Sequence, residues 1–252
     1  MTARRAPLSP RQRTPPSHTD SGRNSSRDLD YCRRPLLAEL TKLVIETLVI
    51  SVYNSNMNQH ELSLGLQHLS DLLQLEGDHA FSIVVCGVSA LIACDLVQRT
   101  TKDVDILALM QGGKLSSPAP LPETLVITAN RVAIDLGLPD DWLNNGPSSG
   151  PGGLFQVGLP DALEDRLTLK SYGTNLQVFY VGRLDQICFK LYAAVDQMGS
   201  YHGQDLAKLN PTLEELEFAI TWVKTQDSSE GFLTMLEQYL MEVGHDDAVQ
   251  FI

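Results

Sequence analysis

Apolar residues recur along most of the chain at helical spacing, and short β-branched runs interrupt this pattern. Between residues 58 and 75 the leucines lie three and four positions apart, which predicts an amphipathic helix. Start and stop signals, such as Pro122, Gly137 and a capping box formed by Thr212 and Glu215, predict further helices. Their expected ranges are 122–136, 184–197, 212–224 and about 227–244.

The β-branched runs predict strands between these helices. Phe81–Cys86 is apolar throughout, as is typical of a buried strand, and Gly87 separates it from a helix expected over Ser89–Leu96. Val104–Leu109 is the next expected strand. Two runs on either side of the turn at residues 173–175 predict a β-hairpin. The expected fold class is α/β (α+β), a small mixed sheet with C-terminal helices.

Composition divides the chain into three parts. Residues 1–30 are rich in Pro, Ser, Thr and Arg, and they hold too few large apolar side chains to offset the entropy lost on ordering. The regular helical pattern begins at Met57. We therefore interpret 1–56 as a disordered or dispensable extension, 57–198 as the core, and 199–252 as a C-terminal helical part.

The net charge and its distribution narrow the classes of function. The net charge is −12, and because residues 1–35 hold eight Arg and three acids, residues 36–252 carry about −17. Such a body does not attract a nucleic-acid backbone over a broad surface, although a local basic patch remains compatible with it.

Targeting signals and cysteines bear on location. No run reaches the roughly 18 uncharged apolar residues of a membrane span. The four cysteines form no CxxC pair, which predicts reduced thiols and a cytoplasmic location. The arginine-rich and serine-rich start leaves an organelle-targeting segment as an alternative.

The pattern Asp103-Val104-Asp105 stands at the start of a predicted strand. Residues two apart on a strand face the same side, so the two carboxylates would project together. Like charges that close repel unless a cation lies between them. Mg²⁺, or Mn²⁺ in its place, is suited to this role, since Mg²⁺ takes one or two carboxylates and keeps its other positions for water and phosphate oxygens.

Upstream, Gly87-Val88-Ser89 joins a predicted strand to a predicted helix. A glycine there lets the backbone approach a ligand, and the first amides of a helix attract anions. The Ser89 hydroxyl could donate to a phosphate oxygen. One turn would then hold a phosphate tail beside a metal on the next strand, an arrangement that suits phosphoryl or nucleotidyl transfer.

Each of these residues also has a purely structural interpretation. The aspartate pair could be a solvated strand end, Gly87 a plain turn, and Ser89 a helix N-cap. Lys190, in the predicted helix 184–197, could be a lysine whose stem packs along the helix face. Asp205 is interpreted as a helix cap.

These motifs carry a family resemblance. The run Val84–Ser89, followed after thirteen residues by Asp103–Ile106, resembles the signature of the polymerase-β-type nucleotidyltransferase-like superfamily. The stretch Arg99–Asp105 is closest to the AbiEii/AbiGii toxin-like and related uncharacterised bacterial nucleotidyltransferases, in which an Arg-x-Thr stretch precedes the acidic pair. Lys190–Ala193 resembles the Lys-Leu-x-Ala helix of that group, and Asp205 begins a similar downstream Asp-Leu pair. The similarity covers about residues 57–245.

The resemblance implies transfer of a nucleoside monophosphate from an NTP to an unknown acceptor, which could be RNA, protein or a small molecule. Asp103 and Asp105 would be catalytic and bind the metal. Gly87 and Ser89 would hold the β- and γ-phosphates, and Lys190 would neutralise their charge. Some relatives are toxins of toxin–antitoxin modules, so an antitoxin or other cognate partner protein is also implied.

The chain departs from the family pattern in three places, one of which is Gly203-Gln204, where an Arg/Lys-Asp pair is expected before Asp205. Val88 stands where many relatives have a second glycine, and the strands expected after residue 166 hold no third acidic residue. These departures leave open an alternative, a catalytically degenerate protein of the same fold that serves as a binding or antitoxin-like partner.

Overall fold

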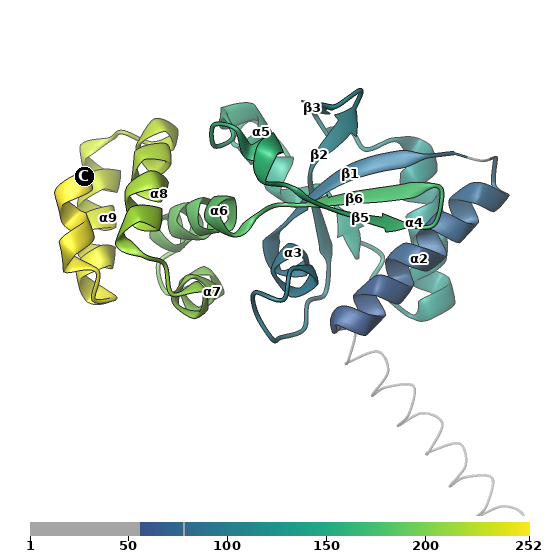
Figure 1. The fold of residues 1–252 in the computed structure, drawn as a ribbon, viewed down its shortest axis with the longest axis horizontal. Coiled ribbons are helices and arrows are strands. Elements are labelled where there is room, and N and C mark those ends of the chain that lie inside the picture. The colour runs from purple at the N-terminus through teal and green to yellow at the C-terminus, as the bar shows by residue number, and fades with distance from the viewer. Residues whose placement is uncertain (1–55, 78) are drawn as a thin grey trace, which may run out of the picture. The chain divides into compact units, whose positions relative to one another are not determined.

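The computed structural model describes residues 56–77 and 79–252 (Figure 1). Of the expected extension 1–56, only Asn56 lies within the described residues. The described residues combine a six-stranded mixed sheet with C-terminal helices, which confirms the predicted fold class.

The sheet is built around β1 (Phe81–Cys86), which is buried on its last four residues. Its strand order is β3-β2-β1-β6-β5, and β4 pairs with β2 beside this path. β1 is antiparallel to β2 and parallel to β6, and a register shift in β1 falls between Val84 and Val85. The other strands are β2 (Val104–Gln111), β3 (Lys114–Ser116), β4 (Leu143–Asn144), β5 (Thr168–Tyr172) and β6 (Leu176–Tyr180).

Three helices accompany the sheet. α2 (Gln59–Leu75) packs against β5 and β6 and contacts both α3 (Gly87–Ala93) and α4 (Glu123–Leu136). Asn58 and Glu61 form a capping box at the start of α2, so its first amides are satisfied. α4 ends at Gly137 in the left-handed conformation, as the sequence predicts.

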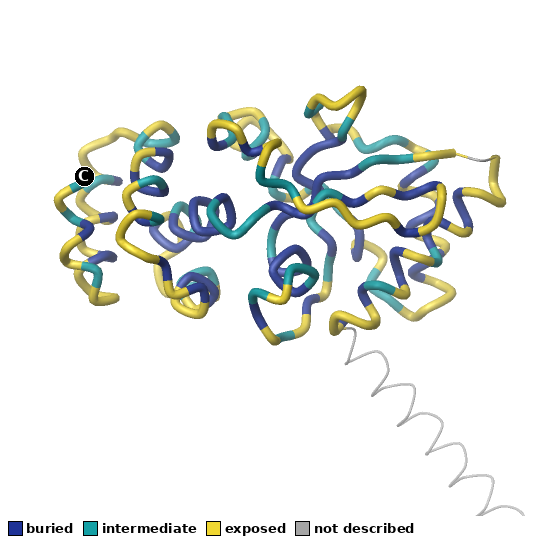
Figure 2. Tube along the Cα trace, in the orientation of Figure 1, coloured by how far each residue is buried: buried dark blue, intermediate teal, exposed yellow. Residues whose placement is uncertain are grey.

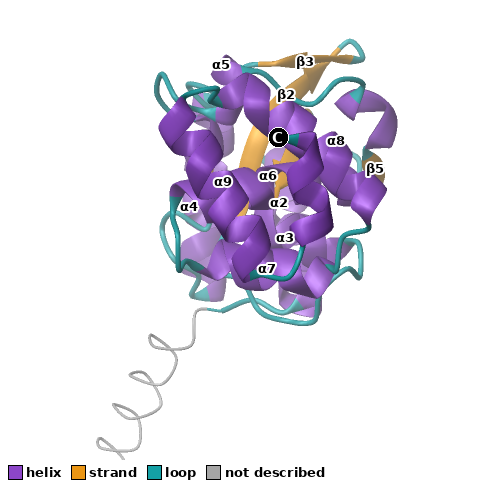
Figure 3. Ribbon diagram, turned by 90° about the vertical axis from the view of Figure 1, so that its left-hand side faces the viewer, coloured by secondary structure: helices purple, strands orange, loops and turns teal. Residues whose placement is uncertain are grey.

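The remaining helices follow the sheet in the sequence. α6 (Arg183–Asp196) packs against α7 (Tyr201–Leu209), α8 (Leu213–Gln226) and α9 (Glu230–Glu242). Figure 3 shows this helical group in front of the strands. The short elements are η1 (Gly146–Ser148), α5 (Leu154–Val157), η2 (Leu163–Arg166) and η3 (Asp246–Phe251). Within residues 56–77 and 79–252, no helix is both long and apolar enough to cross a membrane.

Two ion pairs hold α6 in place. Arg166 binds the buried Asp185 through two hydrogen bonds of 2.9 and 2.6 Å, which ties η2 to the start of α6. Arg183 makes two hydrogen bonds of 2.8 and 3.0 Å to Glu215, the capping-box residue of α8. α6 is thus anchored on both sides before it reaches Lys190.

The core follows the sheet and the inner faces of the helices (Figure 2). Most predicted elements form with bounds close to those expected, including β1 and the hairpin of β5 and β6. The helix expected over 89–96 instead spans Gly87–Ala93, because the chain turns into the helix directly at the glycine. α7 is not among the predicted helices, since its nine residues carry a short and weak apolar pattern.

Candidate functional site

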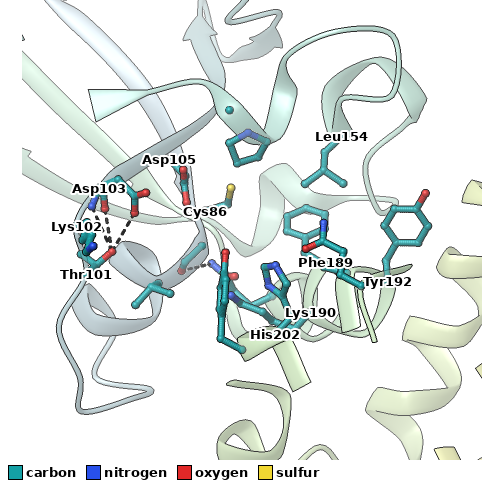
Figure 4. A pocket seen from close by; sticks show the side chains of 18 of the residues that line it. Cys86, Thr101, Lys102, Asp103, Asp105, Leu154, Phe189, Lys190, Tyr192 and His202 are labelled. Atoms are coloured by element: carbon teal, nitrogen blue, oxygen red, sulfur yellow. Dashed lines mark hydrogen bonds between the residues drawn. The ribbon is translucent and has the colours of Figure 1, made fainter. Parts of the chain in front are cut away.

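A cavity of about 910 Å³ lies between the end of β1, the loop that precedes β2, and one face of α6. Four of the five predicted site residues line it, namely Gly87, Asp103, Asp105 and Lys190. Figure 4 shows the two aspartates on one side of the cavity, with Lys190 and His202 facing them from the helical side. The structure therefore brings together groups that lie up to 103 positions apart, from Gly87 to Lys190, at one surface.

Pairing of β2 with its neighbours places the Asp105 carboxylate. Asp105 lies opposite Cys86 of β1 and opposite Asn144 of β4. Asp103 precedes the strand, and the Thr101 hydroxyl lies 3.1 Å from its Oδ1. Met57 pairs with Thr101 through two backbone hydrogen bonds of 2.5 and 2.9 Å. The loop that carries Asp103 is thereby fixed to the segment that leads into α2.

The surroundings of the aspartate pair disfavour a negative charge on Asp105. Burial and, second, the neighbouring Asp103 raise the pKa of Asp105 to about 7, against smaller opposing effects of Lys190 and a hydrogen bond from Asn144. A carboxylate with such a pKa has too little positive charge around it. A hard divalent cation would supply that charge, so Asp103 and Asp105 fit one such ion.

Further protein ligands for a cation are missing from the part of the chain that the structure describes. No group of three or more His, Cys, Asp or Glu side chains is arranged there to hold a metal. A single Mg²⁺ commonly uses only one or two carboxylates and completes its shell with water and phosphate oxygens. The pair is therefore a site for a cation that arrives with, or completes its coordination from, a phosphate ligand.

Gly87 is required at its position for two reasons. Its φ is +71°, a conformation that L side chains adopt at a cost. A Cβ atom there would lie 2.5 Å from Asp105 Oδ2. The glycine thus allows the backbone to pass directly beside the carboxylate.

Gly87→Ala is expected to lower the free energy of unfolding by about 1–3 kcal/mol and to turn the Asp105 carboxylate away from Asp103. Urea denaturation measures the loss. Gly112→Ala is the matched control, because Gly112 also has a positive φ, of +58°, but nothing within 4 Å of the added carbon. An equal loss in both variants would show that only backbone strain acts at Gly87, without the clash with Asp105.

Ser89 lies apart from the other predicted site residues. Its side chain is fully buried, it is absent from the cavity lining, and its hydroxyl donates to the Cys86 carbonyl over 3.2 Å. The helix that it belongs to has seven residues. In this arrangement the Ser89 hydroxyl stabilises the turn, and its predicted contact with phosphate stays a prediction.

Lys190 belongs to a buried ion network. Its side chain is almost fully buried, and its Nζ donates to Asp205 Oδ2 over 2.9 Å. Arg99 donates to the other oxygen of Asp205 over 2.5 Å. Both cations lie within 6 Å of the Tyr201 ring, at 5.9 Å for Arg99 and 5.7 Å for Lys190. The interpretation of Asp205 as a cap is wrong, because Ser200 is the N-cap of α7 and Asp205 is a buried residue inside it.

His202 and Gln186 are cavity residues that the sequence did not single out as part of the site. Burial, and then the nearby Lys190, lower the pKa of His202, so its imidazole is neutral at pH 7 and can accept a proton. Gln186 lies one helical turn before Lys190, and that spacing of four was the only signal in the sequence that could have found it.

The other end of the cavity is largely apolar, with Asp196 as a charged lining residue near Tyr192. Leu154 of α5 and the rings of Phe189 and Tyr192 on α6 line it, on the side away from the aspartates (Figure 4). Phe189 and Tyr192 rest on Trp222 with ring centroids 5.4 and 6.1 Å away. The cavity therefore offers a charged end and a flat, apolar end, as a ligand with both characters requires.

No family model, curated protein or solved structure matches this chain. What the protein does must therefore be inferred from the arrangement of its own side chains. Gly87 and the aspartate pair of the sequence motif meet at this cavity.

Proposed function

We propose that this chain is a metal-dependent nucleotidyltransferase of the polymerase-β type, related to the AbiEii/AbiGii toxin-like group, which moves a nucleoside monophosphate from an NTP to an acceptor. One observation carries the proposal. The Gly87 backbone passes so close to Asp105 that no side chain fits between them, and it does so in a cavity that also holds Asp103 and Lys190.

Each charged residue has a role in this reaction. Asp103 and Asp105 would hold a divalent cation, Mg²⁺ or Mn²⁺, whose positive charge neutralises phosphate oxygens during transfer. Lys190 adds positive charge from the opposite wall, where Asp205 holds its ammonium in place. Lys102, exposed and also lining the cavity, can approach the phosphate tail from solvent.

The transfer forms one bond and breaks one. An acceptor oxygen attacks the α-phosphorus, the bond from that phosphorus to the bridging oxygen breaks, and pyrophosphate leaves with the bonding electrons. The acceptor proton passes to the neutral imidazole of His202 or to water. The acceptor is an RNA, a protein or a small molecule, and the reduced thiols of Cys86 and Cys188 support a cytoplasmic setting.

Binding of Mg²⁺ with NTP provides the test. With the nucleotide at about a hundred times its Kd, the chain should gain about 2.7 kcal/mol of stability, which raises its Tm by roughly 5–10 °C. Asp103→Asn removes half of the carboxylate pair and should abolish this rise. Differential scanning fluorimetry with each of the four NTPs measures the rise, and label from α-³²P NTP measures transfer.

Asp141→Asn is the control, because Asp141 is exposed and outside the cavity. It should respond to Mg²⁺ and NTP as the unmodified chain does. The proposal fails if the unmodified chain shows no Tm change with any NTP in the presence of either Mg²⁺ or Mn²⁺.

A second candidate function is a catalytically degenerate binding or antitoxin-like partner of the same fold. The two-carboxylate site favours it, since the described residues offer no group of three metal ligands. In that case Asp103→Asn and Asp105→Asn would leave complex formation with a partner protein intact. Co-purification of the partner with the double variant, in the absence of any nucleotide response, would select this alternative.

A further inference from the structure

Gln186 carries a buried polar atom that the protein itself does not satisfy. The residue is fully buried on α6 and lines the cavity. Among the described residues, its Oε1 has no hydrogen-bond partner. A buried acceptor without a donor is costly, so such atoms in native proteins call for an explanation.

The orientation of the amide is set by the turn at the charged end of the cavity. Gln186 Nε2 donates to the Gly87 carbonyl oxygen over 3.4 Å. The reversed amide would place two oxygens against each other, so Oε1 is the atom left free. Gly87 in turn lies against the Asp105 carboxylate. The free acceptor of Gln186 therefore lies next to the aspartate corner.

The spacing of residues along α6 gives the distance from the aspartate corner to the apolar end of the cavity. A helix rises about 1.5 Å per residue, so Phe189 lies about 4.5 Å beyond Gln186 along the axis and Tyr192 about 9 Å beyond it. Gln186 lies beside Gly87 and precedes both aromatic rings on α6, and the aspartate pair lies on the side of the cavity away from those rings (Figure 4). In a nucleotide the sugar likewise stands between the phosphates and the base.

The free atom accepts and cannot donate, so its partner must be an O–H or N–H group. Phosphate oxygens offer no hydrogen at neutral pH, and a base amine would lie at the apolar end beside Leu154 and Phe189. We infer that Gln186 accepts a hydrogen bond from a ribose hydroxyl of the bound nucleotide and so selects ribonucleotides over deoxyribonucleotides. This inference rests on the proposed nucleotidyltransferase function.

A deoxynucleotide would leave Oε1 buried and unpaired in the complex, and the lost hydrogen bond should weaken binding about tenfold or more. Gln186→Leu removes the acceptor and keeps a side chain of similar size. It should bind ribonucleotides and deoxyribonucleotides with equal affinity, close to the affinity of the unmodified chain for the deoxy form. If Gln186 only ties α6 to Gly87, its substitution would lower the affinity for ribonucleotides and deoxyribonucleotides by the same factor.

The experiment is isothermal titration calorimetry of the full chain with MgCl₂ and each of ATP, GTP, CTP and UTP, together with their 2′-deoxy and 3′-deoxy analogues. Gln238→Leu is the matched control, because Gln238 is exposed on α9 and outside the cavity. Gln186→Met, whose side chain is unbranched like that of glutamine, replaces the leucine variant if that variant does not fold. Discrimination in the unmodified chain and in Gln238→Leu, lost in the Gln186 variant, supports the inference.

Three results would overturn it, and they are distinguishable. If the unmodified chain binds NTPs but treats the deoxy forms equally, Gln186 reads no sugar hydroxyl and the nucleotidyltransferase proposal stands. If the Gln186 variant changes the preference among the four bases and keeps the preference for ribose, its partner is a base amine. If no NTP binds, the inference fails together with the proposed function.

Discussion

Replacing Asp205 with alanine is expected to lower the free energy of unfolding by about 3–5 kcal/mol, the typical cost of removing one member of a buried ion pair. Asp205 is fully buried and accepts hydrogen bonds from both Lys190 and Arg99. Its removal leaves Lys190, a residue only 4 % exposed, without the carboxylate partner that offsets the burial of its charge. Urea denaturation followed by circular dichroism measures the difference.

Asp135→Ala is the matched control. Asp135 also bonds to a side chain of another helix, His68 at 2.9 Å, but its own side chain is 43 % exposed, so the loss should be at most about 1 kcal/mol. Replacing Lys190 with methionine and Asp205 with leucine together should recover most of the lost stability. In this double variant Arg99 is the one charge of the network that remains, and its side chain reaches solvent. A single Asp205→Ala variant as stable as the Asp135→Ala control would contradict this account.

In metal-free buffer at about pH 8, Asp105→Asn is expected to be more stable than the unmodified chain by about 2 kcal/mol. The difference between a pKa of about 7 in the folded chain and the ordinary value of 3.8 corresponds to roughly 4 kcal/mol, and solvent contact at the cavity screens part of it. Burial is the main cause of the raised pKa, and repulsion from Asp103 is the second.

The stability of the unmodified chain is expected to fall with rising pH because of the proton that folded Asp105 retains. Between about pH 4 and about pH 7 the folded chain keeps a proton on Asp105 that the unfolded chain has released. The contribution of this group to stability is therefore fully present below about pH 4 and is lost as the pH rises through about 7. The asparagine variant has no such loss, so its advantage grows from near zero to its full size over this range.

Thermal unfolding across this pH range, with and without Mg²⁺, measures the effect. Added Mg²⁺ should stabilise the unmodified chain at about pH 8 and leave Asp105→Asn unchanged, because the cation and the neutral amide relieve the same charge. Asp141→Asn on the exposed surface serves as the control. Parallel stability curves for the unmodified chain and Asp105→Asn would rule out a raised pKa at this site.

The sheet elements beside the site could be predicted because their signals are local. The unbroken apolar run of β1 and the glycine that ends it are visible in six or seven consecutive residues, and β1 forms with the expected bounds. The spacing of two between Asp103 and Asp105 predicts a shared face, and both side chains line the cavity. Asp103 lies just before β2 rather than in it, so strand alternation applies to Asp105 alone, whereas the apolar run and the glycine are signals of neighbouring residues and need no tertiary information.

The wall opposite the aspartates could not be predicted with the same precision. Lys190 and Asp205 lie in different helices, and the pattern of neither helix says which way α7 turns back on α6. Ser89 shows the converse, since the motif predicts a phosphate contact whereas packing directs its hydroxyl to the Cys86 carbonyl. Periodicity identifies the buried side of an element but does not identify its partner.

By itself, then, the sequence determined the mixed α/β class, the turn at Gly87 and the common face of the aspartate pair. Tertiary structure alone decided that Asp205 pairs with Lys190 and Arg99, that His202 faces the aspartates, and that Gln186, with a free acceptor, lines the cavity. The physical reason is the distance in sequence over which each interaction acts. Strand alternation and turn geometry arise from neighbouring residues, whereas a buried charge or amide acquires its role from groups that only folding brings within hydrogen-bonding distance.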